Sequence, residues 1–212
     1  MEPDMNRFIQ EQEGIYRLKV PFEDLYTSVF LVVTPQRLIL VDCATTADDV
    51  EFCIIPALME IGIELCNIDT VVLTHLHRDH AGGIDCILCH APDIEVVTDV
   101  RELANGVYTY ALPGHTDDCN GVLDMRTRTL ISGDGIQGMG IGKYRCSLEK
   151  RAAYLQTLER IKKDERIENI LFSHAYEPWC RDRIEGRELV LECLNQCSEY
   201  VKGAKHESNT CK

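Results

Sequence analysis

The segment from Val71 to Gly83, Val-Val-Leu-Thr-His-Leu-His-Arg-Asp-His-Ala-Gly-Gly, constrains the chain more than any other part of its sequence. The apolar run Val71 to Leu73 has the composition of a buried strand. Three histidines and an aspartate follow it at once: His75, His77, Asp79 and His80. Such groups are costly to bury without partners, and imidazole and carboxylate without thiolate favour Zn, Fe or Mn over a structural thiolate zinc site. The segment therefore predicts a metal site at a strand end.

The spacing within the segment suggests two ions rather than one. His75 and His77 are two residues apart, so in an extended turn both side chains point the same way. Asp79 and His80 diverge from that pair and can serve a second ion. Gly82-Gly83 is expected to let the backbone turn tightly and begin a helix beside the ions.

Polar residues also follow other predicted strands. Asp42 and His115 each come at the end of an apolar run, and so do Asp134 and His174. Five of the seven histidines lie at such strand ends. Because binding and catalytic residues concentrate on loops held by a rigid scaffold, we expect these side chains to meet in one site.

The string Thr-His-x-His-x-Asp-His, from Thr74 to His80, resembles the signature of the metallo-β-lactamase superfamily, and the resemblance extends over residues 14–180. It implies that one metal is held by His75, His77 and His115. It implies that a second metal is held by Asp79, His80 and His174, with Asp134 as the bridging carboxylate and Asp42 supporting the motif loop. The implied cofactors are two divalent ions, with Zn expected and Fe or Mn as alternatives.

The chain differs from two groups of the superfamily at ligand positions, and these differences narrow the group that it resembles. Most true β-lactamases carry cysteine in place of Asp134 and lack a histidine at position 80, and flavo-diiron oxygen reductases carry glutamate in place of His77. The pattern is most similar to the glyoxalase II group of thioester and lactone hydrolases, without that group's helical C-terminal domain. The glycine-rich segment 138–144 resembles a glyoxalase II segment that binds a glutathione carboxylate. Lys143 and Tyr144 are therefore expected to contact substrate, although a solvated loop lysine is equally ordinary.

The activity that this resemblance implies is hydrolysis of a small thioester or ester, with lactones as a further option. The expected nucleophile is a hydroxide bridging the two metals. Asp79 and Asp134 are the expected catalytic residues, because their charges partly neutralise the two ions. The alternative is an iron oxidoreductase like the persulfide dioxygenases, which resemble glyoxalase II and hold a single iron. A binding or sensor protein and a nuclease are weaker alternatives.

The net charge and the hydropathy of the chain indicate which partners and which cellular location to expect. The chain has 22 Lys and Arg against 35 Asp and Glu, a net charge of −13. An acidic surface repels phosphate backbones and anionic membranes, so we expect a small-molecule substrate, no nucleic acid and no membrane. No apolar stretch approaches about 20 residues, and the first six are too polar to begin a signal peptide. A soluble, cytoplasmic protein is expected, and the sequence leaves the oligomeric state open.

The eleven cysteines are expected to be reduced in that compartment and mostly buried. Cys86-Ile87-Leu88-Cys89-His90 matches a haem-attachment string, but we expect both cysteines to face the core from one helix. Cys193 and Cys197, four residues apart, are likewise expected to pack rather than form a redox pair.

The order of predicted elements indicates an α/β fold. The expected strands are 15–20, 28–33, 38–41, 70–73, 94–97, 107–112, 121–124, 129–132 and 169–172. The expected helices are 47–61, kinked or split at Pro56, and 83–89, 148–163 and 181–201. Two mixed sheets packed face to face with helices outside would accommodate this order, and the resemblance implies the αββα sandwich. We expect a single domain, 1–212, with residues 1–12 and 203–212 flexible.

Overall fold

Strand β3 (Leu25–Val33) shows how the chain is layered, because side chains on both of its faces are buried. Val29 and Leu31 lie in an apolar cluster beneath helices, whereas Phe30 and Val32 lie in a cluster shared with the second sheet. Successive side chains of a strand point to opposite faces. The sheet that contains β3 is therefore an inner layer, covered on both sides.

The computed structural model describes residues 5–22, 25–136, 148–175 and 181–203. Its first sheet has six strands in sequence order, antiparallel from β1 to β4 and parallel from β4 to β6. Besides β3 they are β1 (Phe8–Gln12), β2 (Ile15–Phe22), β4 (Leu38–Val41), β5 (Thr70–Val72) and β6 (Glu95–Val97).

The second sheet also has six strands, in the order β12-β11-β10-β9-β8-β7. They are β7 (Glu102–Ala104), β8 (Val107–Ala111), β9 (Asn120–Asp124), β10 (Thr129–Ile131), β11 (Asn169–Leu171) and β12 (Arg183–Glu185). Only the β10–β11 pair is parallel among the strand pairs of this sheet that the structure describes. The predicted hairpin of β9 and β10 is confirmed, with Leu123 opposite Leu130.

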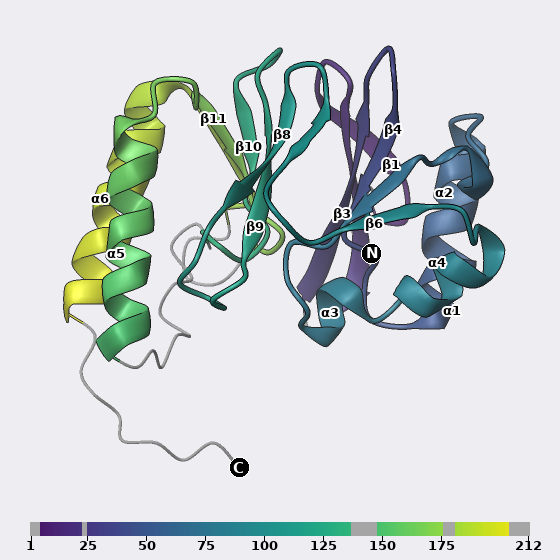
Figure 1. Cartoon of the computed structure of the whole chain (residues 1–212), viewed down its shortest axis with the longest axis horizontal. Helices are drawn as coiled ribbons and strands as arrows, with labels where there is room; N and C mark the ends of the chain where they lie inside the picture. The colour runs from purple at the N-terminus through teal and green to yellow at the C-terminus, as the bar shows by residue number, and fades with distance from the viewer. Residues whose placement is uncertain (1–4, 23–24, 137–147, 176–180, 204–212) are drawn as a thin grey trace.

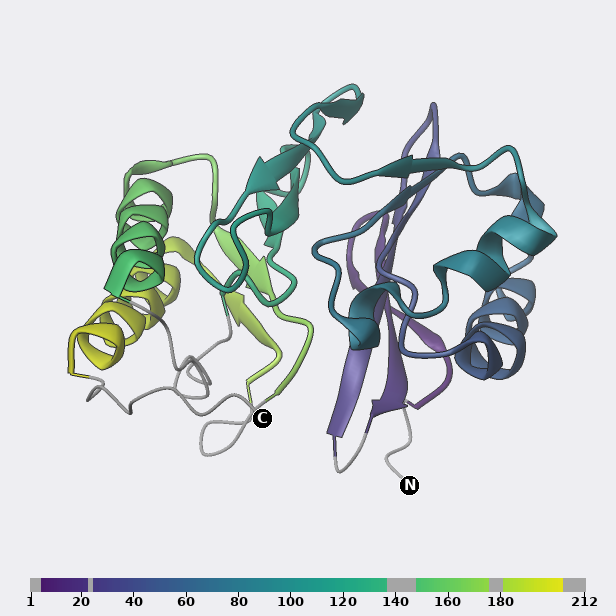
Figure 2. The same cartoon turned by 60° about the horizontal axis from the view of Figure 1, so that its bottom comes forward.

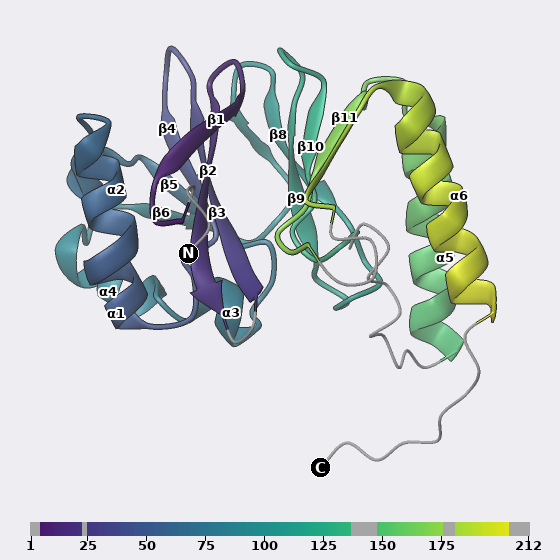
Figure 3. The same ribbon diagram turned by 180° about the vertical axis from the view of Figure 1, so that it is seen from behind.

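Helices cover the outer face of each sheet (Figures 1 and 3). On the first sheet lie α1 (Ala47–Asp49), the π-helical turn η1 (Val50–Ile54), α2 (Ile55–Glu60) and α4 (Ile84–His90). On the second lie α5 (Leu148–Lys163) and α6 (Arg187–Gly203). A short 3₁₀ turn, η2 (Leu65–Asn67), precedes β5, and α3 (Arg78–Ala81) lies at one end of the sandwich (Figure 2). The predicted fold, two mixed sheets with helices outside, is confirmed.

The helical stretch 47–60 changes type in the middle, as the proline predicts. Thr46 begins it with a capping box, in which its hydroxyl accepts from the backbone N–H of Asp49 and the Asp49 carboxylate accepts from Thr46. Ile55 donates its backbone N–H to Val50, five residues earlier, and Pro56 lies in the first turn of α2. Proline lacks the N–H that a continuous α-helix would need there, so the regular ladder is broken before it.

Three elements differ from the sequence-based expectation. Residues 8–12, expected to be flexible, form β1 against β2. Within 181–201, expected to be one helix, residues 183–185 form β12 on β11, and Gly186 at a φ of 92° separates that strand from α6. Strand β7 was not expected. All three strands lie at sheet edges. One residue of β1 and one of β12 are buried, and β7 has only three residues, so the apolar pattern that reveals a strand is weak or short in them.

Other expectations are partly met. Cys43, Cys119, Cys193 and Cys197 are buried, as predicted, whereas Cys66 and Cys89 are exposed. The expectation that both Cys86 and Cys89 face the core is therefore wrong for Cys89. In the described part of the chain, no helix combines the length and the apolar character needed to cross a membrane.

Candidate metal centre

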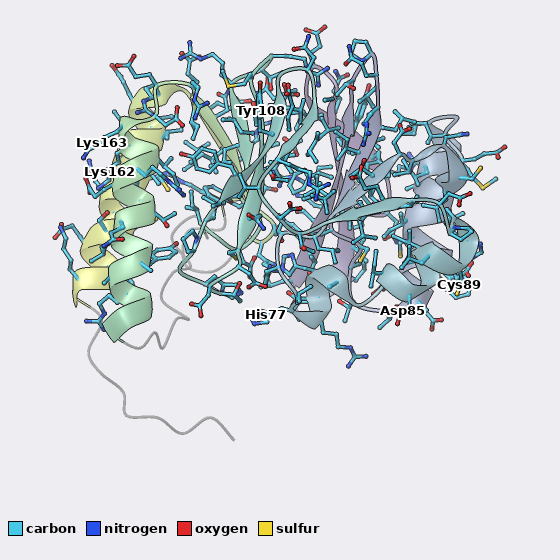
Figure 4. All side chains as sticks on the ribbon, viewed as in Figure 1. His77, Asp85, Cys89, Tyr108, Lys162 and Lys163 are labelled. Atoms are coloured by element: carbon cyan, nitrogen blue, oxygen red, sulfur yellow. The ribbon has the colours of Figure 1, made fainter. Side chains whose placement is uncertain are left out.

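The predicted site residues lie where strands of both sheets end. His75 and His77 follow β5, and His80 lies in α3, which begins directly after His77. Asp134 and His174 follow β10 and β11 of the second sheet. Figure 4 labels His77 beside α3, at the end of the sandwich. The polar residues that follow strands of both sheets therefore lie close together in one site.

Three imidazoles form the first group. The Nε2 atom of His115 lies 2.8 Å from Nδ1 of His77 and 3.0 Å from Nε2 of His75. These three ring nitrogens could hold one ion together. Solvent exposure increases across the group: His75 is buried, His115 is half-buried and His77 is exposed.

Two imidazoles and two carboxylates form the second group, which lies deeper. The Nε2 atoms of His80 and His174 are 3.3 Å apart. The Oδ2 atom of Asp79 lies 3.3 Å from the first of these nitrogens and 3.2 Å from the second. His80 and His174 are buried, and Asp79 is half-buried.

Asp134 faces both groups with different oxygens. Its Oδ1 atom lies 3.5 Å from Nε2 of His80 and 3.3 Å from Nε2 of His174. Its Oδ2 atom lies 3.7 Å from Nε2 of His115, in the first group. A carboxylate placed in this way is able to contribute one oxygen to each of two neighbouring ions.

Asp42 holds the motif loop from behind. Its Oδ1 atom accepts the backbone N–H of Thr74, and its Oδ2 atom accepts the Thr74 hydroxyl. The same Oδ2 lies 2.7 Å from Nδ1 of His80. Asp42 adopts a φ of 64°, a left-handed conformation that aspartate tolerates better than most residues.

Two further contacts orient imidazole rings. Nδ1 of His174 lies 2.7 Å from the backbone carbonyl oxygen of Tyr26, to which only a protonated Nδ1 can donate. Nδ1 of His75 lies 3.2 Å from the Thr74 hydroxyl. In both histidines, and in His80, the contact is made by Nδ1 and leaves Nε2 toward the cluster, as in metal sites whose ligands are oriented by outer hydrogen bonds.

Gly82 and Gly83 are needed for a reason other than the predicted tight turn. Gly82 and Gly83 have φ values of −68° and −88°, which any residue adopts. A Cβ on Gly82 would instead lie 2.0 Å from the carbonyl oxygen of Thr45, and one on Gly83 would lie 2.2 Å from that of Cys43. Their lack of a side chain lets the motif loop pack directly on the backbone after β4.

The electrostatics favour the neutral imidazole at two residues of the first group, His75 and His115. Burial lowers the pKa of His75 to about 2 and that of His115 to about 4. In the second group, burial alone would lower the pKa of His80, but the carboxylates of Asp42 and Asp134 outweigh it and raise that pKa well above its usual value. Burial opposes ionisation of Asp79 and Asp134 too, yet the neighbouring histidines hold both pKa values below the usual range.

The donor set fits divalent metal ions. Five imidazoles and two carboxylates converge, and the nitrogens of neighbouring histidines approach to about 3 Å, as groups that share an ion do. Imidazole and carboxylate suit Zn, Fe and Mn. The cluster is therefore able to bind metal, and the two groups contain the residues that the sequence assigns to the two ions.

Sequence reasoning did not identify every contributor. The carbonyl oxygen of Tyr26 carries no sequence signal, because every residue has one. Thr74 was visible as part of the motif, but its contacts with Asp42 and His75 were not predicted. Phe22, whose ring centre lies 6.1 Å from that of His174, was also missed. Lys143 and Tyr144, the expected substrate contacts, lie outside the described residues.

Comparison with known proteins supports the resemblance that the motif suggests. The model of the metallo-beta-lactamase superfamily matches residues 23–98, which include Asp42 and the whole motif from His75 to His80. The chain therefore resembles this superfamily over the part that carries the motif. Its fold resembles that of the metallo-beta-lactamase FIM-1 from Pseudomonas aeruginosa, solved in its mono-zinc form, with a TM-score of 0.69 at 17% identity over 96% of this chain and 99% of that one.

Two relatives with different names match this chain by sequence. A beta-lactamase-like protein 2 homolog from Drosophila melanogaster is 33% identical over 165 residues, which are 64% of this chain and 54% of the fly protein. A hydroxyacylglutathione hydrolase from Legionella pneumophila (strain Corby) is 22% identical over 156 residues, 61% of each protein. The chain thus spans little more than half of these relatives, and their whole activities do not transfer to it directly.

Proposed function

We propose that the chain is a metal-dependent hydrolase that cleaves a small thioester or ester, with lactones as a further substrate class. The observation that carries this proposal is the position of Asp134, with one oxygen toward each of two groups of metal-ligand side chains. A shared carboxylate is the arrangement expected of a two-metal site. A single-metal protein would need only one of the groups.

In this proposal each group holds one ion. His75, His77 and His115 would hold the first, and Asp79, His80 and His174 the second, with Asp134 binding both. Two divalent ions there, zinc in our proposal with iron or manganese as alternatives, would supply Lewis-acid activation of a carbonyl and of the attacking water. The carboxylates of Asp79 and Asp134 would offset part of the positive charge that the two ions bring.

The residues of the chain prepare the site before any substrate arrives. Burial keeps His75 and His115 neutral, so their lone pairs are available to metal at neutral pH. Asp42 and the Tyr26 carbonyl fix the rings of His80 and His174. His77 is the exposed member of the first group, and we propose that substrate approaches the site from its side.

The comparisons support a thioester substrate without naming it. Hydroxyacylglutathione, the substrate in the name of the Legionella relative, is a thioester. The proposal for Lys143 follows from it: a lysine in the segment after Asp134 would bind a substrate carboxylate. Lys143→Ala should then raise KM with kcat nearly unchanged, because the contact is the same before and during reaction. Tyr144→Phe should have a smaller effect on KM.

The test is a substrate panel with the zinc-loaded chain. Thioesters and lactones should be hydrolysed and β-lactams poorly, and a dialysed chain should regain activity with zinc. Asp134→Asn, which keeps the size of the side chain, should lower kcat by orders of magnitude, whereas Asp124→Asn, at a buried aspartate of β9, should not. A panel with no metal-dependent hydrolysis would rule the proposal out.

The alternative is an iron persulfide dioxygenase. The first group alone provides three imidazoles, those of His75, His77 and His115, which suffice to hold a single iron. Under this alternative the purified chain contains one iron, and it consumes oxygen in the presence of a persulfide. Oxygen uptake together with failure of the hydrolysis panel would replace the hydrolase proposal with this one.

A further inference from the structure

A second cluster of metal-ligand side chains lies on the helical layer that covers the first sheet. Glu51 comes from η1, and Cys86 and His90 come from α4. Figure 4 labels Cys89 and Asp85 of this helix on the side of the molecule away from α5, well apart from His77 of the candidate metal centre. The cluster is therefore separate from the site described above.

The three side chains converge on one point. The Nε2 atom of His90 lies 2.6 Å from Oε1 of Glu51, and the Cys86 thiol lies 3.5 Å from the same oxygen. All three atoms able to bind a metal lie within 4.8 Å of one another. Cys86 and His90 are four residues apart in α4, so they share a face of the helix one turn apart.

The tertiary structure, rather than the local chain, creates this convergence. Glu51 is 35 residues from Cys86 and 39 from His90 in sequence. Its segment, η1, departs from regular α-helical geometry just before Pro56, and π-helical turns of this kind are frequent at functional sites. The cluster thus joins two helical segments that pack side by side on the first sheet.

The donor set is that of a thiophilic metal site. Thiolate, imidazole and carboxylate are the three kinds of side chain that bind zinc in proteins. An ordinary surface ion pair between His90 and Glu51 would account for only two of the three side chains in the cluster. Such exposed pairs contribute little to stability. A thiol beside a carboxylate gains only a weak hydrogen bond, whereas as a thiolate it would be a strong ligand.

We propose that Glu51, Cys86 and His90 form an auxiliary site for a thiophilic divalent ion such as zinc, independent of the His and Asp cluster. On binding, the Cys86 thiol releases its proton to solvent and its sulfur bonds to the metal. The ion links η1 to α4, and α4 directly follows the loop that carries His75 to His80. The site is partly exposed, so metal reaches it without opening of the fold.

Cobalt(II) provides the test, because a thiolate bound to cobalt gives a charge-transfer absorption in the near ultraviolet. The His and Asp cluster contains no cysteine, so cobalt bound there lacks this band. Cobalt titrated into the metal-free full chain should produce the band, with the intensity of one bound thiolate. Cys86→Ser should abolish it, and His90→Gln and Glu51→Gln should each weaken cobalt binding by about tenfold or more.

The chain offers matched controls for the cysteine. The exposed Cys66 also lies 3.5 Å from a carboxylate oxygen, that of Glu64, but it belongs to no group of metal-ligand atoms in the described residues. Cys66→Ser should keep the band, and so should Cys89→Ser, whose cysteine is exposed on the same helix. Cys86→Ser should keep the circular dichroism spectrum and the urea-unfolding midpoint of the parent, which shows that this variant folds.

Several results would overturn the inference. They are the absence of the band in the full chain, its survival in Cys86→Ser, and its loss in Cys66→Ser or Cys89→Ser. Because the readout is the sulfur–cobalt band, it does not depend on whether the main site hydrolyses anything. Failure of the hydrolase proposal and failure of this one are therefore distinguishable.

Discussion

The Oδ2 atom of Asp42 lies 2.7 Å from Nδ1 of His80, and both side chains are completely buried. The carboxylate can only accept, so the hydrogen is on Nδ1 and the Nε2 atom of His80 faces Asp79, Asp134 and His174. The same carboxylate holds the backbone and hydroxyl of Thr74. Asp42 therefore sets both the position of the motif loop and the direction of a ligand atom.

Replacing Asp42 by Asn should weaken metal binding more than it weakens the fold. Asparagine tolerates the left-handed conformation at this position, but its amide cannot accept from Thr74 N, Thr74 Oγ1 and His80 Nδ1 together. Loss of such an outer contact typically costs about 10- to 100-fold in metal affinity. Competition with a chelator measures this. Asp124→Asn, at another completely buried aspartate, is the control and should leave the affinity unchanged.

His80→Ala should remove one of two ions. The first group, His75, His77 and His115, does not include His80, so it should keep its ion while the second group loses a ligand. Elemental analysis should give one metal ion fewer per chain in the variant than in the parent, and the two circular dichroism spectra should be alike. Equal metal content in the two proteins would contradict the two-site assignment.

The two ions should leave at different pH values. Burial lowers the pKa of His75 to about 2 and that of His115 to about 4, so protons compete weakly with metal in the first group. At His80, burial is outweighed by Asp42 and Asp134, and the pKa is raised well above its usual value. Metal must therefore displace a proton there. As the pH falls from about 8 to about 5, the second ion should be lost first.

Dialysis at a series of pH values, followed by metal analysis of the parent and of His80→Ala, checks this order. With both proteins in the Cys86→Ser background, which removes the proposed auxiliary site, the parent should lose its ions in two steps and the variant should show only the step at lower pH. A single step in the parent, with both ions lost together, would mean that the ligand pKa values do not control release.

The sequence predicts the interior of this fold better than its edges. Val29 to Val32 are apolar without interruption, and the strand expected there is confirmed. Helix α5 was expected over the residues that form it. Phe8 is the only buried residue of β1, and Ile184 is the only buried residue of β12. These strands therefore show no periodic pattern of apolar residues. Those strands form because a neighbouring strand offers its hydrogen-bonding edge.

The site shows a similar division. Side chains that meet in the two groups were recognisable from their types and places at strand ends, and their binding of metal stays a prediction. The backbone contacts were not recognisable, because the carbonyl of Tyr26 is chemically like any other. The role of Gly82 was misjudged for the same reason: the carbonyl of Thr45 that excludes a Cβ comes from a distant loop.

Arg17 offers a test of what joins the two halves of the sandwich. Its side chain is 1% exposed, and its guanidinium lies 2.8 Å from the Asp182 carboxylate and 3.0 Å from that of Glu11. It also donates to the backbone carbonyl of Asp182 and lies over the ring of Phe30. Asp182 immediately precedes β12, in the second sheet, so this cation ties β2 to the other half of the fold.

Arg17→Met should destabilise the fold by about 3 kcal/mol, because it removes one partner of a buried ion pair and leaves carboxylates behind. This loss of stability is at the lower end of the range of about 3–5 kcal/mol for breaking a buried ion pair, because Lys19 also lies 2.9 Å from the Asp182 carboxylate and still partners it in the variant. Urea unfolding measures it. Arg101→Met is the matched control: Arg101 lies 2.7 Å from Asp99 with both side chains exposed, and exposed pairs contribute only about 0–1 kcal/mol.

The destabilisation should also depend on pH. Burial raises the pKa of Asp182, but Arg17, and after it Lys19 and Tyr26, outweigh burial and hold that pKa below its usual value of 3.8. A carboxyl whose pKa is lowered in the folded state stabilises the protein above its usual pKa, and this contribution is lost as the pH falls through the folded value. The difference in unfolding free energy between the parent and Arg17→Met should therefore be full at neutral pH and shrink below about pH 4. A difference that stays constant into that acid range would mean that Arg17 stabilises the fold by packing on Phe30 rather than by its charge.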